Sequence, residues 1–363
     1  MAPNKTKRVT NGFMTFVQEW RQTDPVGQGM SLAQAVERCG DVWKVMTPEE
    51  RSPYVEKAMT INLETRKKPS QIVQMDLALR EAEERLEEMK RTTENMVLEA
   101  VEANGLENRH FVFISHNFFT TTVSGDLYVP AEFSACKFSL KQGIMSWYTT
   151  LINPGSLDLG QARDALHHST TTHGLPLPPN ALGERNMNKL YKNIHDYLTR
   201  CIGCKPLIVF TNSEDIGRVK ASLDDLRVKS CHRGKEIVVL GIEYLLFCLK
   251  KQLLLIAGQP IDDIHELCTD SYVKKDVYEF ESHISCKFHE DVDRTQFCSL
   301  SRVQRWGLIT MQVCDVLNIP KKPGKHIPDP DPDPKKVQKN TCLAGFGRGR
   351  PRARLSTLGE ANR

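Results

Sequence analysis

The spacing of apolar side chains predicts a helical beginning to this chain. The aromatic residues of FMTFVQEWR recur every three to four positions after Asn11, which predicts an amphipathic helix with one apolar face. Ser31 precedes a second helical pattern, LAQAVERCGDVWKVM. TPEE is a capping box that places Pro48 at the first position of a third helix. Residues 1–68 therefore form a compact helical unit.

The pattern becomes strongly charged over residues 69–104. QIVQMDLALREAEERLEEMKRTTENMVLEA is rich in Glu, Lys, Arg, Leu and Met, a composition typical of a long solvated helix. Its apolar heptad is irregular, so a linker helix is favoured over a coiled coil that binds a partner.

Residues 105–319 alternate between strand and helix patterns. HFVFISHNFF, EFSACKFSL and MSWYTTLINPG follow one another closely and predict an antiparallel meander. KPLIVFTN and KEIVVLG are two further strands, each followed by a helical pattern. This order predicts an α/β domain with a mixed sheet covered by helices.

The sequence changes again over residues 320–363. PKKPGKHIPDPDPDPKK predicts an extended linker, and GFGRGRPRARL predicts a disordered, Gly/Arg-rich tail. The arginines of the tail resemble an AT-hook core, R-G-R-P, and are candidate nucleic-acid contacts: Arg348, Arg350 and Arg352. A segment that binds RNA without sequence preference is an equal alternative, and a solvated tail is the third.

Composition narrows the class of protein. The chain has 363 residues, of which 40% are hydrophobic, and a formal net charge of +4, which is too small to indicate nucleic-acid binding alone. It contains no apolar run of membrane-spanning length, and MAPNKTKRVTNG does not resemble a signal peptide, so we expect a cytosolic or nuclear protein. Eleven irregularly spaced cysteines then predict thiols and metal ligands instead of disulfides.

Three soft ligands lie within one short stretch, SHISCKFHEDVDRTQFCSL. Cys286, His289 and Cys298 supply two thiols and an imidazole, which are typical zinc ligands. Tetrahedral zinc needs a fourth ligand, which this stretch does not identify.

Two other groups of potential ligands are weaker. Cys201 and Cys204 form a C-x-x-C without a second pair, and we interpret them as a buried helix end. His167, His168 and His173 lie in a Ser/Thr/Pro-rich segment that we interpret as a loop, where they would serve local hydrogen bonds.

The first helical unit resembles an HMG box. KRVTNGFMTFVQEWR followed by CGDVWKVMTPEERSPYVEKA has Trp43, Pro48, Pro53 and Tyr54 in the order of that family. The resemblance implies three helices that bend nucleic acid from the minor groove by wedging an apolar side chain between bases.

Candidate nucleic-acid contacts of the box follow from this resemblance. Met14 occupies the wedge position, and three basic residues are candidate phosphate contacts: Lys7, Arg8 and Lys44. Residues 1–68 hold 11 basic and eight acidic residues, a net charge of only +3. Weak, shape-directed binding to DNA or structured RNA is therefore favoured over sequence-specific reading, and a protein-interaction module is the alternative.

The following domain resembles the DEDD exonucleases of the ribonuclease H-like fold. FVFISHNFF, PAEFSACKF and TTLINPG are similar to the family's first three strands, and THGLP, IVFTNSEDI and HEDVD to its later motifs. However, Ser115 and Asn117 replace the D-x-E carboxylates, while Asp215 and Asp293 lie near the other two acidic positions. Two-metal phosphodiester cleavage needs clustered carboxylates, so this mechanism is predicted to be absent.

The same resemblance suggests the fourth metal ligand. Glu132 lies in EFSACKF, a central strand of this fold, and the segment with Cys286 and His289 is expected to pack beside it. Glu132 with Cys286, His289 and Cys298 makes a closed set, so structural zinc is favoured. In the alternative, Glu132 leaves the metal to admit a hydroxide.

The combination resembles one family, Maelstrom, in its insect-type Glu/Cys/His/Cys form. GFMTFVQEW, PAEFSACKFSL, HHSTTTHGLPLPPNALG and CKFHEDVDRTQFCSLSRVQRW carry the resemblance. It implies piRNA-directed silencing of transposons in the germline, binding to RNA, DNA and piRNA-pathway proteins, and residence in the nucleus and cytoplasm, including perinuclear nuage.

Two other functions stay open. The family resemblance also implies a single-stranded RNA endonuclease that acts without the DEDD carboxylates, although replacement of those acids favours a protein that is not a conventional enzyme. A chromatin architectural protein would require tight binding of residues 1–70 to bent DNA, which the small positive charge disfavours.

Overall fold

The computed structural model describes residues 10–67, 71–122, 128–203, 206–230, 234, 236–262, 264–316 and 318–330. The chain divides into two compact units, Met1–Leu86 and Glu87–Arg363. Several predicted nucleic-acid contacts lie outside the described residues and stay predictions: Lys7, Arg8, Arg348, Arg350 and Arg352.

Residues 10–67 of the first unit form three α-helices, as the apolar pattern predicts. They are α1 (Gly12–Thr23), α2 (Leu32–Val45) and α3 (Pro48–Lys67). Local side chains start each helix: Asn11 accepts a hydrogen bond from the backbone N–H of Met14, and Ser31 forms a capping box with Gln34. The side chain of Glu50 likewise accepts from the backbone N–H of Thr47 at 2.8 Å. The predicted caps are therefore confirmed.

An aromatic cluster holds these helices together. Phe16 contacts the rings of Trp43 and Tyr54, with centroids 5.6 and 5.2 Å apart, and Phe13 contacts Trp43 at 5.8 Å. Val17, Ala35 and Cys39 complete the buried centre. The cluster joins α1, α2 and α3, which is the three-helix core expected of an HMG box.

The long helix α4 (Gln71–Glu102) is only partly a solvated linker. Side chains from 75 to 88 are exposed, as expected of a charged helix. Met96, Val97 and Ala100, in contrast, are buried in the core of the second unit. The interpretation of residues 69–104 as a solvated helix is therefore wrong for its last turns, because their apolar side chains cover the α/β core.

The second unit is built on a five-stranded mixed sheet with the order β3-β2-β1-β4-β5. The strands β1, β2 and β3 are antiparallel neighbours, while β4 and β5 run parallel to β1. Their bounds are Phe111–Thr121, Tyr128–Ser139, Gly143–Leu151, Leu207–Thr211 and Ile237–Gly241. This strand order and the directions are those of the ribonuclease H-like fold that the sequence analysis expected.

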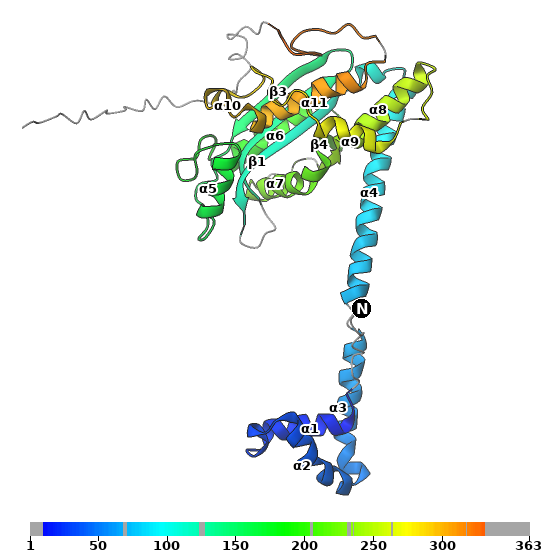
Figure 1. Ribbon diagram of the computed structural model, residues 1–363, viewed down its shortest axis with the longest axis vertical. Coiled ribbons are helices and arrows are strands. Elements are labelled where there is room, and N and C mark those ends of the chain that lie inside the picture. Colours follow the sequence, from blue (N-terminus) through cyan, green and yellow to red (C-terminus); the bar gives the residue numbers. More distant parts are fainter. Residues whose placement is uncertain are drawn as a thin grey trace, which may run out of the picture. The chain divides into compact units, whose positions relative to one another are not determined.

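Helices cover both faces of the sheet. Alternate residues of β1 enter separate cores: Phe111 and Phe113 pack with α8 and α11, while Val112 and Ile114 pack with α6 and α7. Figure 1 shows α11 crossing in front of the sheet and α6 behind it. The bounds of these helices are Met187–Ile202 for α6, Ile216–Lys229 for α7, Ile242–Ile256 for α8 and Ser299–Val313 for α11.

Three shorter helices complete the unit: α5 (Ala162–Thr171), α9 (Glu266–Lys274) and α10 (Lys287–Asp291). The presence of α5 corrects the prediction of a loop at His167 and His168, because both side chains lie on this helix. His173 does make the local hydrogen bonds that we expected: one of its ring nitrogens accepts from the backbone N–H of Leu175 at 3.0 Å.

Residues 318–330 do not leave the core as the Pro/Lys composition predicted. The carbonyl of Lys325 accepts a hydrogen bond of 2.9 Å from the backbone N–H of Ile144, at the start of β3. His326 is 1% exposed. The prediction of an extended linker from residue 320 is thus wrong for this turn, since its backbone adds to the edge of the sheet.

No helix among the described residues has the length and hydropathy needed to cross a lipid bilayer.

Candidate metal centre and the adjoining cavity

Glu132 is a carboxylate buried in the middle of the sheet. It lies on β2 between Asn117 of β1 and Leu151 of β3, and its exposed fraction is 0%. A buried carboxylate needs a partner of opposite charge, hydrogen bonds or a metal ion, because desolvation otherwise destabilises its charged form. The structure supplies candidates for all three.

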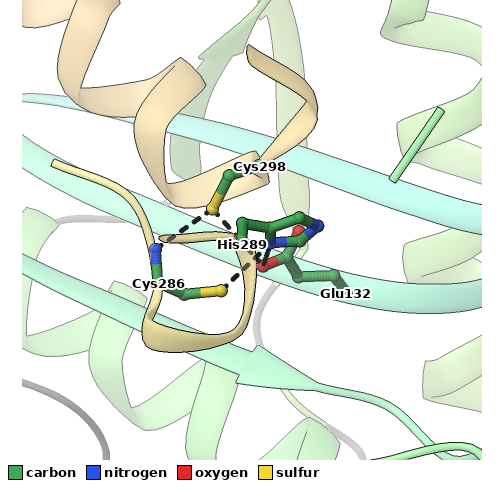
Figure 2. A group of neighbouring side chains, drawn as sticks. All are labelled: Glu132, Cys286, His289 and Cys298. Atoms are coloured by element: carbon green, nitrogen blue, oxygen red, sulfur yellow. Dashed lines mark hydrogen bonds and ion pairs between the residues drawn. The ribbon is translucent and has the colours of Figure 1, made fainter. Parts of the chain in front are cut away.

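The other three ligands arrive from a short segment that packs against β2. Cys286 is the N-cap of α10 and His289 lies within this helix, so the spacing of three residues turns both side chains to the same side. Cys298 is the N-cap of α11 and is fully buried. The helix starts at Cys286 and Cys298 therefore bring distant parts of the sequence to Glu132 (Figure 2).

The spacing of the ligand atoms suits a tetrahedral ion. The Nδ1 atom of His289 lies 3.1 Å from Sγ of Cys286 and 3.6 Å from Oε1 of Glu132, which is itself 3.7 Å from Sγ of Cys298. All four ligand atoms lie within 4.8 Å of one another. Zinc–ligand bonds of about 2.0–2.3 Å would separate tetrahedral ligands by roughly 3.3–3.8 Å. The four side chains are therefore already close to a binding geometry.

A second layer of hydrogen bonds orients the carboxylate. The Nδ2 atom of Asn117 and the backbone N–H of Ser299 both donate to Oε2 of Glu132, each at 2.9 Å. These bonds leave Oε1 facing the thiols and the imidazole. Such outer contacts are characteristic of metal sites, where they fix the direction of each ligand.

The thiols have opposite protonation tendencies. Burial alone would raise the pKa of Cys298, but contacts with Cys286 and His289 lower it to about 6. The hydrogen bond with Cys298, together with burial, raises the pKa of Cys286. Burial would lower the pKa of His289, yet Glu132 and Cys298 raise it to about 9. One thiolate thus forms readily, and thiolate is the sulfur species that binds metals.

The four positions compared with the DEDD acids have different surroundings in the structure. The Oγ atom of Ser115 accepts a hydrogen bond of 3.2 Å from Arg302, and the side chain of Asn117 is held by Glu132. Asp215 pairs with Arg218 and lies 4.0 Å from Arg302. Asp293 is exposed on the turn after α10. Arginines therefore lie beside Ser115 and Asp215, two of the positions where the exonuclease pattern requires carboxylates that bind metal ions.

A cavity of about 290 Å³ adjoins these residues. It is lined by parts of β1, α5, α7 and α11, among other segments, and its wall includes Asn117, Phe118, His168, Asp215 and Arg302. Phe118, His168 and Arg302 were not predicted from the sequence to be site residues. The segment SRVQRW could have indicated this site, because it places two arginines on one side of a helix that is otherwise mostly apolar and buried.

In the first unit, Met14 is half-buried on α1 and Lys44 is exposed on α2. Lys44 makes a 3.0 Å ion pair with Asp41, and both side chains are largely exposed. Exposed pairs of this kind contribute little stability, so Lys44 is free to exchange Asp41 for another anion. The roles of Met14 and Lys44 in nucleic-acid binding stay predictions.

Fold and site together define a class of protein: an HMG box joined to a ribonuclease H-like domain that carries a buried Glu/Cys/His/Cys set. A family model for HMG-box domains matches residues 3–72, and one described as Maelstrom, a piRNA pathway germ-plasm component, matches residues 121–332. The chain belongs to the Maelstrom family.

Similar proteins cover most of the chain. Protein maelstrom of Drosophila yakuba is 48% identical over 339 residues, which are 90% of this chain and 72% of that protein. Protein maelstrom of Drosophila melanogaster is 48% identical over 335 residues, with the same coverage of 90% and 72%. Protein maelstrom 1 of Drosophila ananassae is 46% identical over 334 residues, which are 88% of this chain and 79% of that protein.

Among solved structures, exonuclease I of Escherichia coli in complex with an oligonucleotide has a TM-score of 0.32 and 10% identity. The match covers 57% of this chain and 42% of the exonuclease. The ribonuclease H-like assignment rests on the strand order and strand directions of the sheet.

Proposed function

We propose that this chain is a nucleic-acid-associated factor of piRNA-directed transposon silencing in germ cells. It binds single-stranded or structured RNA, its HMG box adds contacts to DNA or RNA, and it works with proteins of the piRNA pathway. One observation carries the proposal: a ribonuclease H-like sheet has Ser115 and Asn117, both buried and hydrogen-bonded, at the positions of metal-binding acids. Such a fold retains a surface for nucleic acid without the carboxylates that two-metal cleavage requires.

The metal centre is proposed to hold structural zinc. Two thiolates, an imidazole and a carboxylate suit zinc, and four protein ligands leave no position for a reactive water. The ion would fix α10 and the start of α11 on β2. Elemental analysis of the purified chain tests this, with one zinc ion per chain expected. Another metal, or no metal in protein prepared without chelators, would contradict it.

Binding is tested with the purified full-length chain by fluorescence anisotropy. The ligands are single-stranded RNA, duplex RNA, linear duplex DNA and a four-way DNA junction, each over a range of salt concentrations. We expect measurable binding to RNA that weakens steeply as salt is raised. If no RNA is bound at any salt concentration, the proposal fails. If the junction alone is bound tightly, the chromatin architectural alternative replaces it.

The same samples test the endonuclease alternative. Intact RNA after prolonged incubation is expected because the DEDD carboxylates are absent. Cleavage that persists across separate preparations, and in Glu132→Gln protein that remains folded, would establish an enzyme whose catalyst is not the bound metal.

The silencing role is tested by complementation of germ cells that lack their own family member. The wild-type chain is expected to restore low transposon transcript levels, and a fluorescent fusion is expected in the nucleus and cytoplasm, including perinuclear nuage. Normal expression without any fall in transposon transcripts would contradict the proposed role.

A further inference from the structure

The cavity beside the metal centre lies at a switch point of the strand order, where the chain leads to opposite sides of β1. Neighbours of β1 are β2 on one side and β4 on the other, and β1 runs parallel to β4. Ligands of α/β sheets commonly bind beyond the carboxyl ends of strands at such a switch point. Asn212 follows β4 directly and lines the cavity together with residues 116–118 of β1. A volume of about 290 Å³ is at the small end of ligand pockets, which span roughly 300–1,000 Å³.

Aromatic side chains gather in one part of the cavity. The imidazole of His168 stacks on Phe118 with ring centroids 4.6 Å apart and planes 13° from parallel. The ring of Tyr128 meets Phe118 edge to face, with centroids 5.0 Å apart and planes at 71°, and the guanidinium of Arg218 lies 5.6 Å from the centre of the Phe118 ring. All four side chains line the cavity. Aromatic rings and guanidinium planes are the surfaces on which proteins stack the unpaired bases of single-stranded RNA.

The charged side chains that line the cavity balance one another in formal charge. Three arginines and three acidic residues line the cavity: Arg218, Arg302, Arg305, Glu214, Asp215 and Asp276. Arg218 pairs with Asp215, and Arg305 lies 3.2 Å from Asp276. Because the formal charges cancel, the cavity offers no net attraction to a phosphate group. It suits a neutral planar ligand that has hydrogen-bond donors and acceptors along one edge.

We propose that this cavity binds one unstacked guanine base of single-stranded RNA. The guanidinium of Arg302 donates to O6 and N7 of the base, and the neighbouring carboxylate of Asp215 accepts from its N1–H and N2–H groups. The separation of 4.0 Å between Arg302 and Asp215 places this donor and this acceptor side by side. Phe118, His168 and Tyr128 supply the stacking surface. The inference rests on the proposed binding of RNA and adds the selectivity of the ribonuclease H-like domain.

Affinity of the full-length chain for two RNAs tests the base preference. Fluorescence anisotropy compares oligouridine with the same RNA that carries one central guanosine. The guanosine is expected to tighten binding about tenfold, in line with a bidentate arginine contact. Arg302→Lys should remove this difference, because an ammonium group cannot form the bidentate pair. The matched control is Arg227→Lys, at an exposed arginine of α7 that pairs with Asp224 outside the cavity, and it should retain the preference.

A second variant keeps the test informative if Arg302→Lys fails to fold. His168→Ala removes a stacking ring from the surface of α5 and should weaken binding of the guanosine-containing RNA about fivefold or more. Thermal unfolding establishes that each variant is folded. Equal affinity of the two RNAs for the wild-type chain, or a preference that survives in both Arg302→Lys and His168→Ala, would overturn the inference.

Photo-crosslinking locates the base. RNA with 6-thioguanosine at the central position should crosslink to peptides that contain Phe118, Tyr128 or His168. Crosslinks confined to residues 10–67 would overturn the inference while leaving RNA binding intact. Complete absence of RNA binding would instead refute the proposed function, and the guanine pocket with it.

Discussion

The substitution Glu132→Gln separates the metal-binding role of this side chain from its structural role. Glutamine has nearly the same shape, and its amide oxygen can still accept from Asn117 and from the backbone N–H of Ser299. The amide nitrogen would then face His289 and Cys298, where the oxygen ligand was. An amide nitrogen is not a metal ligand of the kind that zinc uses in proteins.

The size of the effect follows from the two hydrogen bonds. To offer its oxygen to the metal, the glutamine amide must rotate and lose both of them. A buried hydrogen bond contributes about 1–1.5 kcal/mol, so the rotation costs about 2–3 kcal/mol in total. Since 1.4 kcal/mol corresponds to a factor of ten, we expect zinc affinity to fall about 30- to 150-fold.

The effect on stability should depend on the metal. In zinc, Glu132→Gln protein should unfold at lower temperature than wild type, because less binding free energy favours the folded state. In EDTA the difference from wild type should be smaller, because no zinc binding is lost and only the contact between Glu132 and His289 is removed.

Zinc competition with a chromophoric chelator measures the affinity, and thermal unfolding with zinc or EDTA measures the stability. The matched control is Glu243→Gln. Glu243 is another buried carboxylate of the same unit, which accepts from the backbone N–H of Ser213, and its loss should act equally in zinc and in EDTA. Unchanged zinc affinity in Glu132→Gln, or equal destabilisation in both conditions, would refute the metal centre.

Three further predictions concern stability. Burial lowers the pKa of His116 to about 3, against roughly 6.5 in the unfolded chain, so the unfolded state takes up the proton first as pH falls. Denaturant titrations between pH 6.5 and 3 measure the free energy of unfolding. For each unit that the pH falls, His116→Asn should lose up to about 1.4 kcal/mol less of this free energy than wild type. An equal pH dependence in both proteins would contradict the prediction. Gly143→Ala would push a Cβ atom into the carbonyl of Lys325, so trypsin should cleave the turn at Lys325 faster. The control is Gly258→Ala, which also lies at positive φ but faces open space, and it should not change cleavage at Lys325. Trp43→Ala removes the ring that joins α1, α2 and α3 and should lower the free energy of unfolding of the first unit by roughly 3 kcal/mol, measured by circular dichroism; a loss below about 1 kcal/mol would show that the aromatic cluster is dispensable.

The sequence predicted most accurately those features that are determined by residues close together in the chain. The helix starts at Ser31 and Pro48 are encoded within one turn of the chain, and the spacing of Cys286 and His289 is set by a single short helix. To predict that Glu132 lies beside these ligands, the order of the strands also had to be known, and that order came from a resemblance to a known fold.

The cavity was not predictable because its residues meet only after folding. Arg302 contacts Ser115, which lies 187 positions away, and Phe118 stacks on His168 from another element. Helix α5 was missed because its sequence, ARDALHHSTT, ends in residues with weak helix propensity. The turn at Lys325 was missed for a similar reason, since Pro- and Lys-rich composition gives no sign of the strand edge that it contacts.

The outer strand β3 has backbone contacts at both of its ends. Lys325 accepts from Ile144 at one end, and the backbone N–H of Glu184 donates to Leu151 at the other. A bare strand edge is a template for pairing with another molecule, and covering its ends shortens the length on offer. Protein truncated at residue 319 would expose the first of these ends and should form soluble aggregates at concentrations where the longer chain stays dispersed. We therefore expect the turn at Lys325, whose composition resembles that of a simple connector, to hinder pairing of this sheet edge with other copies of the chain.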